Sequence, residues 1–139
     1  MRSKSKKHSK KKADKWFSIY KRLENASPQG LCRCITCGRA GHWKNFDNGH
    51  FILRDKEATR YDPRNAHAQC KNCNRFRSGE QYKHSQYIAK TYGEEELEEL
   101  ETKAKMGGLM KRTQVDYEYI ADYYRQKAKE LAKQKGLEI

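Results

Sequence analysis

The chain has 139 residues, of which 35% are hydrophobic and 35% are charged, and its formal net charge is +13. This length allows one compact domain, and the small apolar fraction allows only a modest core, which a metal or disulfides usually reinforce. The sequence has no apolar run of membrane-spanning length and no apolar stretch typical of a secretion signal. We therefore expect an intracellular protein that binds a polyanion, nucleic acid rather than a membrane surface.

The first fifteen residues are the most basic segment, with eight Lys or Arg and a single acid, Asp14. Because almost nothing in residues 1–15 can pack, we predict a disordered basic arm that contacts DNA, with a merely solubilising tail as the alternative. The next apolar residues recur at helical spacing and predict an amphipathic helix that ends near Asn25; they are Trp16, Ile19, Tyr20 and Leu23.

All five cysteines lie in residues 31–78, and four of them form two pairs, Cys34-x2-Cys37 and Cys70-x2-Cys73, with 32 residues between the pairs. In a reducing compartment such pairs indicate metal rather than disulfides. Four thiolates suit a tetrahedral Zn²⁺ with no open position, which makes the zinc structural. Two unrelated thiol pairs or a redox pair are the alternatives, and Cys32 can replace Cys34 as a ligand, although the spacing favours Cys34.

The spacer between the two pairs is long enough for two strands and the start of a helix. We predict a strand over residues 46–53, interrupted by a tight turn at residues 47–49 just before His50. Residues 60–61 are expected to return as the second strand, which Pro63 ends. A helix is expected to begin near Cys70 and to continue to Arg77.

The rest of the chain is predicted to be helical. One helix covers residues 81–92, and an acidic helix with a buried Leu97, Leu100 and Ala104 stripe follows Gly93. After the Gly107-Gly108 break, Thr113 is expected to cap a last helix along which Val115, Tyr119 and Tyr123 align. We thus divide the chain into the arm (1–15), a zinc-bound domain with flanking helices (16–105) and a C-terminal helix for packing or dimerisation (106–139).

Three motifs follow in order between residues 34 and 79. They are a Cys-x-x-Cys-Gly knuckle, an Asp-x-Gly-His-aromatic strand (residues 47–51), and Asn-x-His-x-Gln-Cys-x-x-Cys-Asn (residues 65–74) with a following Ser-Gly. Over residues 31–101 this order resembles the NinG (Rap) recombination endonucleases of lambdoid phages, and more broadly HNH nucleases with a four-cysteine zinc. The resemblance implies an α+β fold: a small ββα-metal core held by zinc and flanked by an N-terminal helix and C-terminal helices.

The resemblance also implies catalytic roles. By position, His50 becomes the general base, Asn65 the residue that orients it, and Asn74 a ligand of the catalytic divalent ion, Mg²⁺ or Mn²⁺. Phosphodiester hydrolysis needs a base that works near neutral pH, which suits imidazole, and a cation to stabilise charge on the phosphate. A simple packing or phosphate-contacting histidine is the plainer interpretation of His50.

The chain departs from the best-known HNH pattern at two positions. Asn74 is a weaker ligand than histidine, and Gly49 stands where many relatives carry a metal-binding Asp or His. Asp47 and His67 are therefore our candidates to complete the metal shell, with His50 as a further ligand. His42 and His84 have no such context and are expected at the surface.

Basic residues around these motifs are expected to clamp the phosphate backbone, which positions DNA without reading its sequence; they are Arg54, Lys56, Arg60, Arg64, Lys71, Arg75 and Arg77. The resemblance implies branched recombination intermediates, such as Holliday junctions and D-loops, as substrates, and recombination proteins as partners. It also implies a host cytoplasm or nucleoid location for a phage-encoded protein. Symmetrical cutting of a junction suggests a homodimer, with the tyrosines of the last helix at its interface or in the core.

Two other functions remain open on the sequence alone. One is an HNH nuclease of restriction or homing type, which would prefer a sequence over a branch. The other is a non-catalytic zinc module that tethers basic segments to nucleic acid, which would bind without cutting.

Overall fold

The computed structural model describes residues 5–139, so the first four residues of the predicted arm lie outside the described part. Its helices are α1 (Lys6–Asn25), α2 (Glu57–Arg60), α3 (Gln81–Tyr92), α4 (Glu94–Met106) and α5 (Gln114–Lys135). Its strands are β1 (Leu31–Arg33), β2 (Ala40–His42), β3 (Asp47–His50) and β4 (Ala66–Gln69). The fold is therefore α+β, as predicted. None of the described helices is long and apolar enough to cross a membrane.

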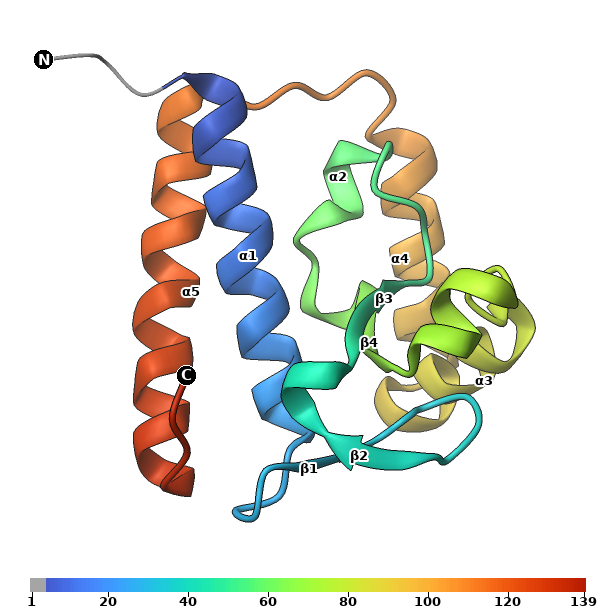
Figure 1. Ribbon diagram of the computed structural model, residues 1–139. Coiled ribbons are helices and arrows are strands. Elements are labelled where there is room, and N and C mark those ends of the chain that lie inside the picture. Colours follow the sequence, from blue (N-terminus) through green and yellow to red (C-terminus); the bar gives the residue numbers. More distant parts are fainter. Residues whose placement is uncertain (1–4) are drawn as a thin grey trace, which may run out of the picture.

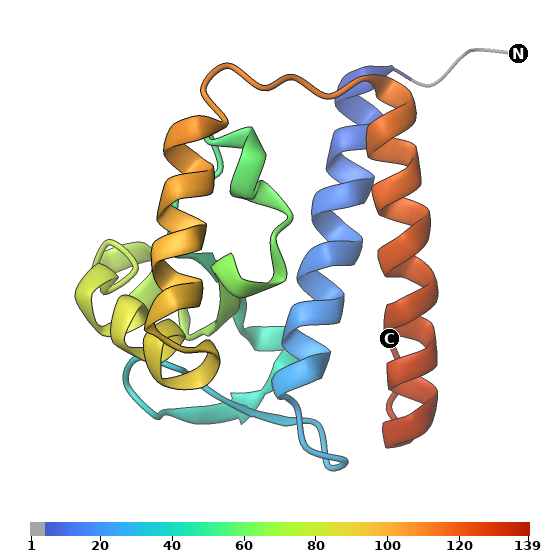
Figure 2. The ribbon, with the colours of Figure 1, turned by 180° about the vertical axis from the view of Figure 1, so that it is seen from behind.

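The elements form three groups across the molecule (Figure 1). Helices α1 and α5 lie side by side in one group, the strands and α2 lie in the middle, and α3 and α4 cover the opposite side. Figure 2 shows the same order from behind, with α4 returning the chain toward the start of α5. As a result, α1 contacts α5 on one face and the β3–β4 hairpin on the other.

The prediction of a disordered arm is wrong for the described residues 6–15, which form the first half of α1. Ser5 caps the helix by accepting a hydrogen bond from the His8 amide. The side chains of Ser9, Ala13 and Phe17 are buried, because α5 covers this face of α1. The partner of the basic segment is more than a hundred residues away, so local composition does not reveal it. The predicted helix end at Asn25 is confirmed.

Helix α5 runs in the same direction as α1 (Figure 1) and is fixed at both ends. Thr113 and Asp116 form a capping box, which confirms the predicted cap. At the other end, Lys135 donates to the backbone oxygens of Leu23 and Ala26 at the end of α1. The face toward α1 is buried and consists of Tyr117, Ala121, Tyr124, Ala128 and Ala132.

The tyrosines of the last helix therefore divide between two faces. Tyr117 and Tyr124 belong to the core, while Tyr119 is 70% and Tyr123 43% exposed. Val115, predicted to align with these outer tyrosines, is exposed as well. Small residues at three of the five inward positions let α1 and α5 approach closely.

The β3–β4 hairpin differs from the predicted strands. Asn48 and Gly49 pair in register with Ala68 and His67, so residues 47–49 belong to a strand and form no turn. The second strand is β4, not residues 60–61. Arg60 instead ends α2, because Arg60 and Tyr61 both bind Asp14 on α1 and are held away from the hairpin. The helix predicted from Cys70 to Arg77 is a single π-helical turn, Asn72–Phe76.

Two apolar clusters share α1. One surrounds the cysteines and includes Trp43, Phe46 and Leu23. The other joins α1 to α5 and α2 through Phe17, Tyr61 and the two inner tyrosines of α5. Both clusters are small, in agreement with the low apolar fraction.

The close approach of α1 and α5 predicts that the substitution Ala128→Leu is destabilising. Ala128 is fully buried between the two helices, and added methylene groups in a filled core cost about 1–3 kcal/mol. Thermal or urea unfolding should show this loss. Gln126→Leu, which places the same side chain on the exposed side of α5, is the matched control and should change stability by less than about 0.5 kcal/mol. Equal stabilities of the two variants would contradict the tight packing.

Candidate active site

Four of the five cysteines meet at one point, as predicted. Cys34 and Cys37 lie in the turn of the β1–β2 hairpin, and Cys70 and Cys73 flank the start of the π-helical turn. Their four sulfur atoms all lie within 4.8 Å of one another, and the Sγ atoms of Cys37 and Cys70 are 3.7 Å apart. A tetrahedron with Zn–S bonds of about 2.3 Å has edges of about 3.8 Å. The donor set and its spacing thus fit zinc.

Cys32 lies apart from this cluster. Its side chain is buried and donates to the backbone oxygen of Arg22 in α1. Burial raises the pKa of this thiol to about 11, which keeps it protonated and unlike a metal ligand. The spacing argument that favoured Cys34 therefore agrees with the geometry.

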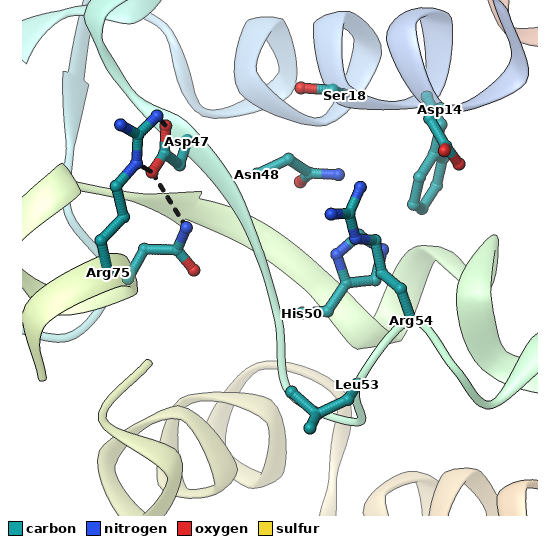
Figure 3. A pocket seen from close by; sticks show the side chains of 10 residues that line it. Asp14, Ser18, Asp47, Asn48, His50, Leu53, Arg54 and Arg75 are labelled. Atoms are coloured by element: carbon teal, nitrogen blue, oxygen red, sulfur yellow. Dashed lines mark hydrogen bonds and ion pairs between the residues drawn. The ribbon is translucent and has the colours of Figure 1, made fainter. Parts of the chain in front are cut away.

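A hollow of about 400 Å³ lies between α1 and the β3 strand (Figure 3). Helix α1, strand β3, the loop after β3 and the π-helical turn all contribute side chains. The lining residues are Asp14, Phe17, Ser18, Asp47, Asn48, His50, Leu53, Arg54, Asn74 and Arg75. Three residues of the predicted site, His50, Asp47 and Asn74, are thus brought together.

His50 is held in one orientation at this hollow. Its Nε2 lies 3.0 Å from the backbone oxygen of Arg60, and because a carbonyl only accepts, Nε2 carries the proton. Burial lowers the pKa of His50 to about 4, although the Arg60 carbonyl acts in the opposite direction, and the charges of Arg54 and Arg60 add to the lowering. The imidazole is therefore neutral at pH 7, with Nδ1 unprotonated, which is the state that a general base requires.

Asn65 does not contact His50, contrary to the simplest form of the predicted role. Its amide holds the loop that follows β3, by accepting from the Ile52 amide (2.7 Å) and by donating to the backbone oxygens of Ile52 (2.9 Å) and Thr59 (3.1 Å). The carbonyl next to that of Thr59 is the Arg60 carbonyl that accepts from His50. Asn65 thus holds the loop whose Arg60 carbonyl accepts from His50.

Asp14 is a site residue that the sequence analysis did not identify. It accepts from Arg60 Nε (2.9 Å), from Arg60 Nη2 (2.6 Å) and from the Tyr61 hydroxyl (2.7 Å). Arg60 Nη1 in turn donates to the backbone oxygen of Arg54. The signal was present in the sequence, because Asp14 is the only acid in an otherwise basic segment.

Asp47, Asn74 and Arg75 form a polar group that also lines the hollow. Asp47 and Arg75 lie at the opposite end of the hollow from His50 and Arg54 (Figure 3). The Asp47 carboxylate accepts from Asn74 Nδ2 at 2.9 Å and from Arg75 at 2.8 and 3.0 Å. Burial disfavours the charged carboxylate, but the bonds from Arg75 and Asn74 outweigh it and lower the pKa of Asp47. Asp47 and Asn74 are oxygen donors of the kind Mg²⁺ binds, and Arg75, whose side chain is 57% exposed, has room to leave the carboxylate.

Gly49 has no room for a side chain, because Gln69 packs directly against it. A Cβ atom there would lie 1.8 Å from Gln69 Oε1. The same Gln69 side chain donates to the backbone oxygen of Gly79 and to the Thr36 hydroxyl in the cysteine knuckle. A larger residue at position 49 would therefore displace the Gln69 side chain, which connects β4 with the turn that carries Cys34 and Cys37.

His67 is separated from the hollow, so it is not a candidate for the metal shell. It pairs with Gly49 in the β3–β4 hairpin and is not among the residues that line the hollow. Its Nδ1 lies 2.8 Å from His84 Nε2, and its Nε2 lies 2.9 Å from the Tyr92 hydroxyl. His84, expected at the surface, is fully buried in this contact. His42 is exposed, as expected.

Two of the seven basic residues expected on DNA are largely buried in ion pairs within the fold. Arg60 binds Asp14, and Arg64 binds Asp62 and Glu96, with side chains only 11% and 17% exposed. The sequence does not distinguish these structural arginines from surface ones. The remaining five are exposed and lie on the loop after β3 or on and beside the π-helical turn: Arg54, Lys56, Lys71, Arg75 and Arg77.

The cysteine geometry predicts that zinc content depends on the four clustered cysteines and not on Cys32. Purified wild type should contain about one zinc ion per chain. Cys73→Ser should lose most of its zinc and unfold at a lower temperature, because the free energy of metal binding stabilises the folded chain. Metal analysis with thermal melting measures both. Cys32→Ser is the matched control, a buried cysteine outside the cluster, and should keep its zinc. Zinc loss in Cys32→Ser but not in Cys34→Ser would contradict the assignment.

Comparison with known proteins identifies the chain. The family model described as "Bacteriophage Lambda NinG protein" matches residues 1–135. No curated protein and no solved structure matches the chain. The matched range includes α1 and α5, which lie outside the motifs of residues 31–101, so the resemblance extends over almost the whole chain. The chain therefore belongs to the NinG family.

Proposed function

We propose that this chain is a metal-dependent DNA endonuclease of the HNH type that cuts branched recombination intermediates, such as Holliday junctions and D-loops, by phosphodiester hydrolysis. The observation that carries the proposal is the neutral, oriented His50 in a hollow that also contains Asp47, Asn74 and two arginines. The antiparallel β3–β4 hairpin followed by the π-helical turn supports the ββα-metal assignment. Membership of the NinG family supports the substrate class.

In the proposed reaction, His50 Nδ1 takes a proton from a water molecule, whose oxygen then bonds to phosphorus. One phosphate ester bond breaks, and the leaving oxygen takes a proton from solvent. The imidazolium that forms is stabilised by the Arg60 carbonyl, because a charge-assisted hydrogen bond is stronger than a neutral one. Asn65 and Asp14 keep that carbonyl in place through the loop and the Arg60 side chain.

Asp47 and Asn74 would hold the catalytic Mg²⁺ or Mn²⁺. When bound, such an ion stabilises the charge that develops on the phosphate and on the leaving oxygen. Once Asp47 binds the ion in place of Arg75, the freed guanidinium would bind the phosphate. Arg54, at the opposite end of the hollow, adds positive charge toward the DNA backbone.

Exposed basic and apolar surfaces support the proposed partners, which are DNA and a second copy of the chain. Exposed Lys56, Lys71 and Arg77 continue the basic surface around the hollow. A homodimer that brings two active sites to one junction would find an apolar face on α5 at Val115, Tyr119 and Tyr123. Recombination proteins are the further partners proposed.

The first test is cleavage of a labelled four-way junction and of a matching linear duplex with Mg²⁺ or Mn²⁺. Wild type should cut the junction preferentially, and His50→Ala should bind it but cut about 10²–10⁴-fold more slowly, the range typical of a lost general base. His42→Ala, an exposed histidine outside the hollow, is the matched control and should cut normally. Binding without cleavage by all three proteins would instead indicate a non-catalytic zinc module, and a sequence preference over branches would indicate a restriction or homing nuclease.

The environment of His50 also predicts the pH dependence of cleavage. The reactive form is the neutral imidazole, so activity falls as the pH drops through the pKa of His50, which lies near 4. The acidic limb of the rate profile should therefore lie well below the ordinary histidine value of about 6.5. Arg54→Gln removes a charge that lowers this pKa and should move the limb to higher pH. Lys56→Gln, a neighbouring charge without that role, should leave its position unchanged, and a limb near 6.5 in wild type would contradict the buried, neutral His50.

A further inference from the structure

Leu53 is an exposed leucine at the edge of the hollow. Its side chain is 64% exposed, and it lines both the hollow of His50 and an adjoining depression that His50, Asn74 and Gly79 also line. Figure 3 shows Leu53 on the loop that follows β3, next to His50 and Arg54. Leucine is among the apolar side chains that DNA-binding proteins insert between base steps.

The backbone that presents Leu53 is fixed on both sides. Asn65 binds the amide and the carbonyl of Ile52, the preceding residue. Arg60 donates to the carbonyl of Arg54, the following residue, at 2.8 Å, and the Leu53 carbonyl itself accepts from the Lys56 amide. The backbone that carries Leu53 is therefore held by Asn65 and Arg60, the same two residues that hold the loop around His50.

A second exposed apolar side chain lies in the π-helical turn, two residues after Asn74. Phe76 ends the π-helical turn, is 81% exposed, and stands between Arg75 and Arg77. Leu53 likewise has an arginine next to it in the sequence, Arg54. Apolar groups with cations directly beside them suit nucleic acid, in which bases present apolar faces and the adjacent phosphates present charge. A protein partner would not require that each apolar group be accompanied by arginine.

We propose that Leu53 is an apolar wedge that enters between unstacked DNA bases beside the phosphate that His50 attacks. The inference rests on the proposed nuclease function for the position of that phosphate. Opening a paired, stacked duplex costs free energy, whereas bases at a branch point are already partly unstacked. Insertion of Leu53 would therefore cost less free energy at a branch point than in a duplex, which explains the proposed preference for branched DNA.

The direct test measures base unstacking and does not depend on cleavage. A four-way junction carries the fluorescent base 2-aminopurine at the branch point, and His50→Ala protein with Mg²⁺ holds it uncut. Binding should raise the fluorescence, since 2-aminopurine is quenched when stacked, and the added change Leu53→Ala should abolish the rise while junction binding persists. Leu53→Met, which keeps an apolar side chain of similar size, should restore it. Leu31→Ala is the matched control, because Leu31 is a 51% exposed leucine on β1 that does not line the hollow.

Cleavage provides a second, separable readout. Leu53→Ala in the otherwise wild-type protein should cut a junction about tenfold more slowly, the lower end of the effect of losing one base contact. Two mismatched pairs placed beside the cut should restore the rate, because the bases are then already open. Unchanged fluorescence and unchanged cleavage in Leu53→Ala would overturn the wedge and leave the nuclease standing. A fluorescence rise that needs Leu53, in a protein that cuts nothing, would support the wedge and reject the nuclease.

Discussion

The ion pair between Asp14 and Arg60 connects the two halves of this molecule. Asp14 belongs to α1, which α5 covers, and Arg60 ends the short helix beside the β3–β4 hairpin. Through its guanidinium Arg60 holds the Arg54 carbonyl, and through its own carbonyl it holds His50. An Arg–carboxylate pair with two parallel bonds fixes direction as well as distance. The helical pair therefore serves as the frame against which the candidate active site is positioned.

The sequence predicted best what neighbouring residues determine. The bounds of α3, the Thr113 cap and the end of α1 follow from apolar spacing and capping residues, and the two cysteine pairs follow from their own spacing. Features that depend on distant partners were predicted incorrectly. Residues 6–15 are helical because of α5, and the second strand lies at residues 66–69 because α1 holds residues 60–61 elsewhere.

The candidate site shows the same division. His50, Asp47 and Asn74 were proposed from motifs and do share one hollow. His67 was proposed with them to complete the metal shell, yet its ring packs against His84 and Tyr92 and does not line the hollow. Similarly, seven basic residues near the motifs were expected on DNA, but the acids that bind Arg60 and Arg64 lie on distant helices and in a neighbouring turn. Charge counts cannot separate an arginine that holds the fold from one that faces solvent.

The parallel arrangement of α1 and α5 has a consequence for the order of folding. The two helices are the first and last elements of the chain, and Lys135 joins the end of α5 to the end of α1. Contacts between such distant segments form late, because a long loop must close first. During synthesis the four-cysteine region emerges well before α5, so the cysteine cluster can form while α1 still lacks its partner. The hollow then acquires its α1 wall, and with it the Asp14 support of His50, only after α5 has emerged. A growing chain can thus carry its four-cysteine region before the candidate active site is finished.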